Sequence, residues 1–218
     1  MKKTFAQSSA AIEAYATALF KPQDKVLREI IRRATAAGLP PIQVSPMDGL
    51  HLEILTRAAG AKKALEIGTL AGYSGVCIAR GLARGGRLTT LEFSGKHAGV
   101  AAESFRRAGL SKNVTIVVGP ALESLRKLEA GGPYDLVFID ADKENYPAYL
   151  AWAARHLRVG GIFLADNTFA WGEIVDSKSA DPKVRALRRT NRLAAQSPRF
   201  RSTILPTGEG LSFGVKVR

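Results

Sequence analysis

Short apolar segments alternate with stretches of helical periodicity along residues 64–165, and this alternation constrains the fold more than any other feature. The apolar segments are 64–67, 88–91, 114–118, 136–139 and 162–165, and the helical stretches between them are 73–84, 96–109, 121–129 and 144–156. Such a pattern is typical of a parallel sheet covered by helices on both faces. Each apolar segment ends at a glycine or an acid, which is the end where open α/β sheets bind ligands.

The two ends of the chain follow other patterns. Helices are expected at 5–20, at 22–38 and from Pro46 to about residue 59, with Ser45 as the N-cap of the third. A basic helix at 182–196 precedes strands at 201–205 and 211–217, and the turn-rich connection between these strands predicts an antiparallel hairpin. The 218 residues are therefore expected to form one domain, with N-terminal helices in 1–60 and an α/β core in 61–218.

Composition excludes several classes of protein. The sequence has no stretch close to the roughly 20 apolar residues of a membrane helix, and polar residues from Gln7 to Glu13 argue against a signal peptide. The single cysteine, Cys77, excludes a disulfide framework and multi-cysteine metal sites. We expect Cys77 to be buried and inert, and the protein to be cytoplasmic.

The formal net charge of +13 admits an acidic partner. Positive charge is dense in the helix at 182–196, which carries Lys183, Arg185, Arg188, Arg189 and Arg192. We favour a solvated helix face. The functional interpretation is a docking patch for a polyanion such as RNA, or for an acidic coenzyme A thioester.

A glycine-containing loop at 66–75 follows the first strand of the predicted sheet. Glycine there lets the backbone approach a ligand closely, and Glu92 at the end of the next strand can hold two ribose hydroxyls. Leu70 stands where the dinucleotide fingerprint has its second glycine, so a nucleoside without phosphates fits better than a pyrophosphate cofactor. A tight strand-to-helix turn beside an edge acid is the alternative.

Oxygen-bearing side chains follow the fourth and fifth strands. Asp140 ends one strand, and Asp166 and Asn167 end the other. If these strands are neighbours, three oxygen ligands converge, and such a set suits a hard cation such as Mg²⁺. An Asx turn at Asp166 and Asn167 is the structural alternative.

Together these segments resemble a known family. The most specific motifs are Leu65–Thr69 with Gly72–Ser74, Val137–Tyr146, Gly160–Asn167 and Leu205–Leu211. They resemble the cation-dependent, S-adenosylmethionine-dependent O-methyltransferases, which include caffeoyl-CoA and catechol-type enzymes and small bacterial relatives. The resemblance implies a Rossmann-like class I methyltransferase fold. Its seven-stranded sheet is mostly parallel with one antiparallel strand, has helices on both faces, and is preceded by extra N-terminal helices.

The resemblance also implies roles for individual residues. The cofactor S-adenosylmethionine would contact Val44, Glu66, Gly68, Thr69, Ser74, Glu92, Ala121 and Asp140. Glu92 stands where the family more often has aspartate. Asp140, Asp166 and Asn167 match the metal ligands, and Lys143 matches the position of the general base. The metal is expected to be Mg²⁺, with Mn²⁺ or Ca²⁺ as substitutes.

The chemistry implied is direct methyl transfer. The metal would bind two adjacent substrate oxygens and lower the pKa of the attacking hydroxyl. Lys143, deprotonated beside the dication, would take the proton. The resemblance thus makes Lys143 and the metal ligand Asp140 the predicted catalytic residues. Trp171 is expected either to stack on an aromatic substrate or to pack its own loop, and Tyr146 is a further candidate substrate contact.

The leading hypothesis is a Mg²⁺-dependent O-methyltransferase that acts on a vicinal dihydroxy aromatic such as a caffeoyl derivative. One alternative keeps the chemistry but uses a hydroxylated uridine in tRNA as the acceptor. Another is a non-enzymatic protein that binds the cofactor or RNA. The resemblance further implies a homodimer, and no membrane association is expected.

Overall fold

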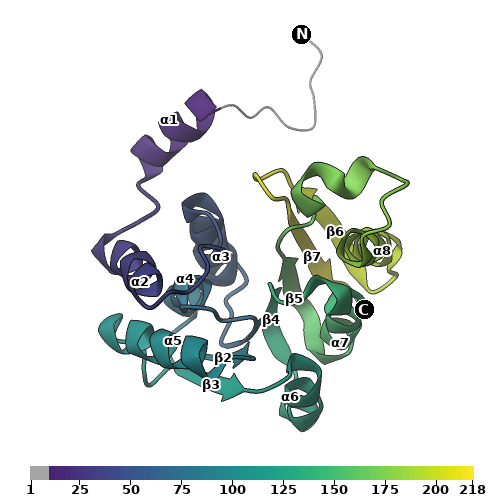
Figure 1. Cartoon of the computed structure of the whole chain (residues 1–218). Coiled ribbons are helices and arrows are strands. Elements are labelled where there is room, and N and C mark those ends of the chain that lie inside the picture. Colours follow the sequence, from purple (N-terminus) through teal and green to yellow (C-terminus); the bar gives the residue numbers. More distant parts are fainter. Residues whose placement is uncertain (1–9) are drawn as a thin grey trace.

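A computed structural model describes residues 10–218, which form a seven-stranded sheet (Figure 1). The strands are β1 (Lys63–Ile67), β2 (Arg87–Glu92), β3 (Val114–Val118), β4 (Tyr134–Ile139), β5 (Leu157–Ala165), β6 (Phe200–Leu205) and β7 (Leu211–Lys216). Their spatial order is β3-β2-β1-β4-β5-β7-β6, with β7 antiparallel to both of its neighbours. The predicted mostly parallel sheet with one antiparallel strand and a C-terminal hairpin is confirmed.

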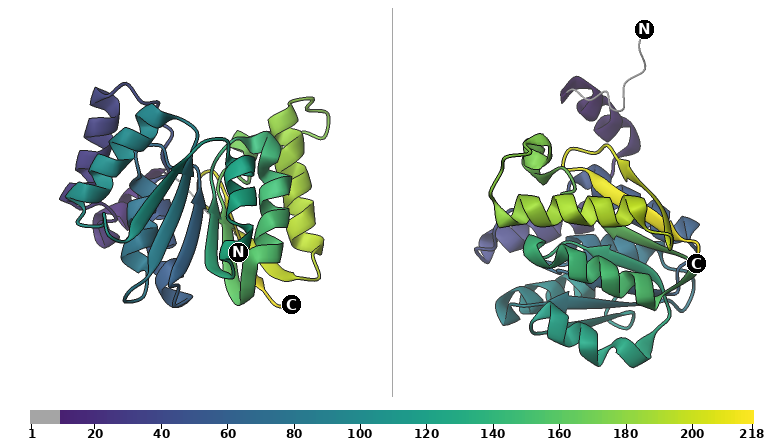
Figure 2. Two further views of the ribbon diagram at one scale, coloured as in Figure 1. Left: turned by 90° about the horizontal axis from the view of Figure 1, so that it is seen from below. Right: turned by 90° about the vertical axis from the view of Figure 1, so that its right-hand side faces the viewer.

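Helices cover both faces of this sheet, as Figure 2 shows. The helices are α1 (Ala10–Phe20), α2 (Lys25–Ala36), α3 (Pro46–Ala58), α4 (Tyr73–Gly81), α5 (Gly95–Arg107), α6 (Ala121–Lys127), α7 (Tyr146–His156) and α8 (Pro182–Gln196), with short 3₁₀ turns η1 (Glu129–Gly131), η2 (Lys143–Asn145) and η3 (Ala170–Val175). Helices α2 to α5 contribute to one hydrophobic core, and α6 to α8 contribute to the other.

The sequence of strand β4 is apolar at successive positions because both faces of the strand are buried. Leu136 and Phe138 belong to the core beneath α2 to α5, whereas Val137 and Ile139 belong to the core beneath α6 to α8. All four side chains are fully buried. Successive side chains of a strand point to opposite faces, so a strand covered on both sides cannot alternate between apolar and polar residues.

Element boundaries differ from the predictions mainly near the N-terminus. Residues 5–9 of the first predicted helix lie outside the described residues. Helix α2 begins at Lys25 rather than at residue 22, because Asp24 caps it by accepting a hydrogen bond from the Leu27 amide at 2.9 Å. Lys21 has a left-handed φ of 45°, which separates α1 from α2. Strand β5 begins at Leu157, ahead of the predicted strand at 162–165.

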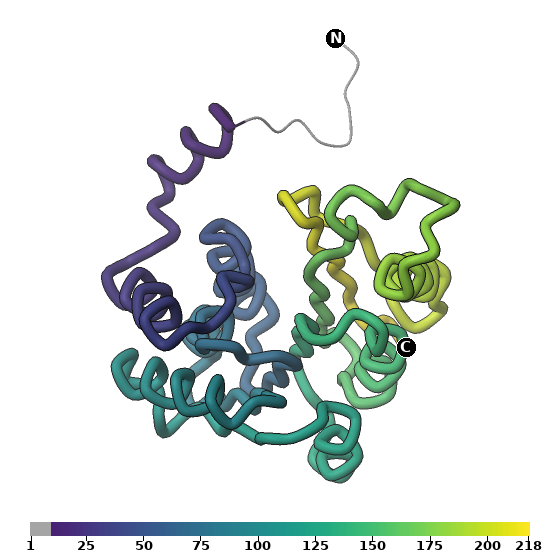
Figure 3. The backbone as a smooth tube through the Cα atoms, viewed as in Figure 1, coloured from purple at the N-terminus to yellow at the C-terminus, as the bar shows by residue number. Residues whose placement is uncertain are grey.

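Helix α1 differs from the other helices in its packing. It has no buried residue, and its side chains Tyr15, Leu19 and Phe20 are exposed. The chain trace shows α1 extending away from the rest of the protein (Figure 3). Among the described residues, no helix combines the length and the hydropathy needed to cross a membrane.

Candidate active site

The strand ends meet at one edge of the sheet. The Asp140 amide donates to the Ile67 carbonyl at 2.8 Å, and the Asp166 amide donates to the Ile139 carbonyl at 3.0 Å. These bonds continue the parallel ladders β1–β4 and β4–β5 by one residue beyond the strands. Asp140 and Asp166 therefore lie side by side, as the predicted neighbouring strands require.

Only glycine fits at position 68, because two backbone segments come into contact there. Its φ is +99°, and a Cβ atom at this position would lie 1.9 Å from the Asp140 carbonyl oxygen. Any side chain would collide with main-chain atoms that cannot rotate away. The glycine thus brings the loop after β1 against the loop after β4.

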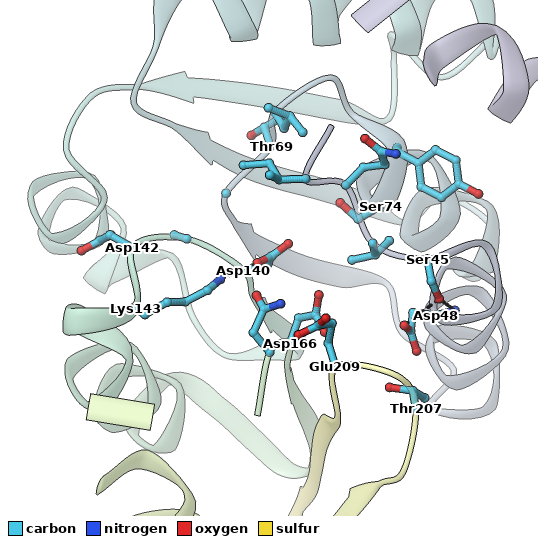
Figure 4. A pocket seen from close by; sticks show the side chains of 18 of the residues that line it. Ser45, Asp48, Thr69, Ser74, Asp140, Asp142, Lys143, Asp166, Thr207 and Glu209 are labelled. Carbon is cyan, nitrogen blue, oxygen red and sulfur yellow. Dashed lines mark hydrogen bonds and ion pairs between the residues drawn. The ribbon is translucent and has the colours of Figure 1, made fainter. Parts of the chain in front are cut away.

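A cavity of about 1420 Å³ opens over this sheet edge. Small-molecule sites usually have about 300–1,000 Å³, so this cavity has room for two ligands. Most predicted site residues line it, namely Val44, Gly68, Thr69, Ser74, Glu92, Ala121, Asp140, Lys143, Asp166, Asn167 and Trp171. In Figure 4, Asp140, Lys143 and Asp166 gather near its centre, with Thr69 and Ser74 farther along the wall.

Glu92 holds the glycine-containing loop as well as facing the cavity. Its Oε2 accepts hydrogen bonds from the amides of Thr69 (3.2 Å) and Leu70 (2.8 Å), and its Oε1 accepts one from the Ser94 amide at 2.9 Å. Leu70 has a φ of 49°, the left-handed conformation that the fingerprint glycine would adopt without strain. The acid predicted to bind the ribose therefore also stabilises a strained turn.

Glu66 lies behind the cavity wall. It is fully buried and is not among the residues that line the cavity, which does not fit a direct contact with the cofactor. The hydroxyls of Ser74 and Thr90 each donate to its carboxylate at 2.6 Å. Burial raises the pKa of Glu66 to about 8, although the two hydroxyl donors oppose this rise. Glu66 thus supports Ser74, which does line the cavity.

This buried acid predicts a pH dependence of stability. Because the pKa of Glu66 is about 8 in the folded protein and 4.5 in the ordinary state, the folded state retains a proton that the unfolded state loses. The contribution of Glu66 to the free energy of unfolding is fully present below pH 4.5. Between pH 4.5 and pH 8 this contribution falls by about 1.4 kcal/mol per pH unit. The variant Glu66→Gln should flatten this slope in urea unfolding at pH 5.5, 7 and 8.5. Glu129→Gln, an exposed change, should keep it, and equal slopes for both variants would contradict the assignment.

Lys143 is held in place by two neighbours. Its Nζ donates to Asp140 Oδ1 and to the Tyr146 hydroxyl, both at 2.8 Å, and the Tyr146 hydroxyl donates to the Ile139 carbonyl at 3.3 Å. Tyr146 is fully buried and does not line the cavity. This placement contradicts the predicted substrate contact of Tyr146, because the first turn of α7 packs the ring beneath Lys143. Tyr146 instead orients the lysine.

Asp166 meets the requirements of a cation ligand. The residue is 4% exposed, and no described residue donates a hydrogen bond to its Oδ1. Burial, followed by the charge of Asp140, raises the pKa of Asp166. A buried carboxylate beside a second one is stabilised by a bound cation. No group of three His, Cys, Asp or Glu side chains in residues 10–218 could hold a metal, so the predicted set depends on the amide of Asn167.

The loop after β5 is strained. Asn167, Ala170 and Trp171 all have left-handed φ values, between 48° and 55°. Such conformations cost free energy and concentrate at functional sites. Trp171 is 53% exposed and lines the cavity, so a ligand in the cavity can reach its side chain.

The structure adds polar residues that sequence reasoning missed. Asp48 and His51 of α3, and Thr207 and Glu209 of the β6–β7 connection, line the same cavity. Asp48 follows Ser45 by three residues, a pattern that indicates only a helix cap. Glu209 lies in a turn between glycines, which indicates only a hairpin.

Comparisons with known proteins agree with this geometry. The sequence profile of the O-methyltransferase family matches residues 17–217. A catechol O-methyltransferase from Niastella koreensis is 41% identical over 197 residues, covering 89% of each chain. One from Mycobacterium tuberculosis is 42% identical over 196 residues, covering 90% of this chain and 88% of the relative. The crystal structure of an O-methyltransferase from Bacillus cereus in complex with SAH has a TM-score of 0.89 and 41% identity, covering 94% of this chain and 97% of the other.

Proposed function

This chain belongs to the O-methyltransferase family and is an S-adenosylmethionine-dependent O-methyltransferase; from this premise we propose that its methyl acceptor is a catechol-type aromatic and that Mg²⁺ is required. Two relatives at 41% and 42% identity are catechol O-methyltransferases, which supports the acceptor class. Because the chain is an enzyme of this family, the hypothesis of a non-enzymatic binding protein is set aside.

The observation that carries the proposal is the charge of the cavity. Although the whole chain has a net charge of +13, eight acidic residues and two lysines of the described part of the chain line the cavity. An acidic cavity attracts cations, and both Mg²⁺ and the sulfonium of S-adenosylmethionine are cations. The acids at the sheet edge, Asp140 and Asp166, are the pair that would hold the metal, together with Asn167.

The residues divide the chemistry between them. The glycine-containing loop, Ser74 and Glu92 would bind the cofactor and orient its methyl group. When bound, Mg²⁺ would lower the pKa of the acceptor hydroxyl. Lys143, which Tyr146 orients, would take the proton from that hydroxyl after releasing its own. Trp171 would cover the aromatic ring and exclude water. The enzyme positions two reactants, so no covalent enzyme intermediate is needed.

Methyl transfer from labelled S-adenosylmethionine tests the proposal. We expect Mg²⁺-dependent label on members of a catechol panel that includes caffeoyl thioesters, and no label on their monohydroxy analogues. Bulk tRNA from cells that lack this protein is assayed in parallel. Full activity on catechols in excess chelator would refute the metal requirement, and label on tRNA alone would refute the acceptor.

The tRNA alternative has one observation in its favour. Helix α8 carries four exposed basic residues that have no acidic partner within 4 Å among residues 10–218, namely Lys183, Arg185, Arg189 and Arg192. Arg188 differs, because it donates to the carbonyls of Ile174 and Asp176 and so anchors the loop of η3. These four basic side chains of α8 could bind the phosphate groups of a nucleic acid backbone.

A homodimer is a further proposal, supported by α1. A helix with apolar side chains and no buried residue is normally covered in an assembly. Tyr15, Leu19 and Phe20 are the exposed side chains that a second copy would cover. Light scattering should give the mass of two chains, and Leu19→Lys should shift the protein toward the mass of one chain. A monomeric wild-type protein would contradict this proposal.

A further inference from the structure

One wall of the cavity has polar atoms to which the proposed function assigns no role. We call it the distal wall; it consists of Asp48 from α3 and of Thr207 and Glu209 from the β6–β7 connection. Figure 4 shows Asp48 and Thr207 on the side of Asp166 away from Lys143, with Glu209 next to Asp166. An acceptor whose hydroxyls lie at Asp140 and Asp166, as the proposed function requires, would extend toward the distal wall.

Three oxygens of the distal wall are buried without a hydrogen-bond donor among the described residues. They are Asp48 Oδ1, Thr207 Oγ1 and Glu209 Oε2. A buried acceptor without a donor costs free energy that a folded protein normally avoids. Since all three residues line the cavity, a bound ligand can supply the missing donors.

Asp48 is the most deeply buried member, at 3% exposure. Its Oδ2 accepts a hydrogen bond from the Ser45 hydroxyl at 2.7 Å, and its amide donates to Ser45 Oγ at 3.1 Å. The helix cap therefore accounts for Oδ2 only. His51 Nδ1 lies 3.5 Å from Oδ1, which is longer than an ordinary hydrogen bond. Asp48 Oδ1 is thus available to a donor of a ligand.

The charge of the cavity selects the kind of donor. Among residues 10–218, no arginine lines the cavity, and the lysines that line it are Lys143 and Lys183. Lys143 is already bound to Asp140 and Tyr146. A carboxylate on the acceptor would meet the like charges of Asp48 and Glu209, whereas a protonated amine would form charge-assisted hydrogen bonds with both.

We propose that the distal wall is an acceptor subsite that binds a protonated amine on the side chain of the aromatic acceptor. This inference rests on the proposed function, because it names a substituent on the acceptor of the same site. The wall thereby distinguishes cationic catechols from neutral catechols and from catechols with an acidic tail.

Three catechols that differ only in one side chain test the subsite. The ring carries at its fourth position an ethyl, a 2-aminoethyl or a 2-carboxyethyl group. For the wild-type enzyme we expect kcat/KM for the amine to exceed that for the ethyl compound by about 10- to 100-fold, and the carboxylate to be the poorest substrate. Equal values of kcat/KM for the amine and ethyl compounds would overturn the proposal.

Two variants test whether the distal wall causes the preference for the amine over the ethyl compound. Asp48→Asn and Glu209→Gln should each reduce the amine-to-ethyl ratio by about tenfold, and Glu129→Gln, an exposed change outside the cavity, should preserve it. The ratio compares two substrates on the same variant, so partial unfolding or weaker cofactor binding cancels. A ratio unchanged in both variants would overturn the proposal.

Calorimetric binding of the same compounds, with S-adenosylhomocysteine present, separates this inference from the proposed function. Methylation of the ethyl compound without any preference for the amine would retain the function and overturn the subsite. If no catechol is methylated, tighter binding of the amine that is lost in Asp48→Asn would retain the subsite, and equal binding of all three would overturn it.

Discussion

Replacing Asp166 with alanine is expected to lower kcat for methyl transfer by about 10³-fold, which corresponds to about 4 kcal/mol of lost transition-state stabilisation. The variant lacks one of the two carboxylates that would hold Mg²⁺, and Asp166 is the buried one of the pair. Asp166 is not one of the predicted cofactor contacts, so the Kd for S-adenosylmethionine should change by less than about threefold. Single-turnover kinetics and calorimetry measure the two quantities.

Stability provides the control for this variant. The pKa of Asp166 is raised by burial and by the charge of Asp140, so the carboxylate is unfavourable in the metal-free protein. Asp166→Ala should therefore keep or raise Tm in the presence of chelator. Mg²⁺ should raise the Tm of the wild-type protein and not that of the variant. A kcat within tenfold of the wild-type value would contradict the role of Asp166.

Replacing Lys143 with methionine is expected to lower kcat by about 10²- to 10⁴-fold, the usual contribution of a positioned general base. Methionine keeps the length of the side chain but cannot take a proton. The KM for the acceptor should change much less, because Lys143 is held by Asp140 and Tyr146 rather than by the substrate.

Lys143→Arg distinguishes a base from a fixed positive charge. A guanidinium keeps the charge but does not lose its proton in proteins, so the arginine variant should be as slow as the methionine variant. Recovery of activity in Lys143→Arg would instead show that charge is the contribution of Lys143. Lys178→Met, an exposed change outside the cavity, is the matched control and should have the wild-type kcat.

The local pattern of apolar residues was sufficient to predict the layers of the fold and the positions of the acidic residues that end its strands. The strands ending near Glu92, Asp140 and Asp166 are where the apolar segments predict them, because a strand buried on both faces requires an uninterrupted apolar run. Parallel strands place their carboxyl ends at one edge, so the meeting of Asp140 and Asp166 follows once β4 and β5 are neighbours.

Side-chain direction was less predictable. Glu66 and Tyr146 stand in the motifs that carry the family resemblance, yet both are fully buried and neither lines the cavity. Glu66 turns toward Ser74 and Thr90, and Tyr146 turns beneath Lys143. A motif locates a residue on an element, but the packing of that element decides whether its side chain meets a ligand or supports one that does.

The sequence by itself determined the α/β architecture, the glycine-containing loop and the acids at the sheet edge, because each depends on local periodicity or on residues close together in the chain. The reaction class followed from the resemblance of its motifs to a known family. Only the tertiary structure decided which polar groups share the cavity. It brought Asp48 and Glu209, which lie far apart in the sequence, to face Asp166. Their unpaired oxygens exist only in the folded chain, since burial against α3 and the β6–β7 connection is what removes water from them.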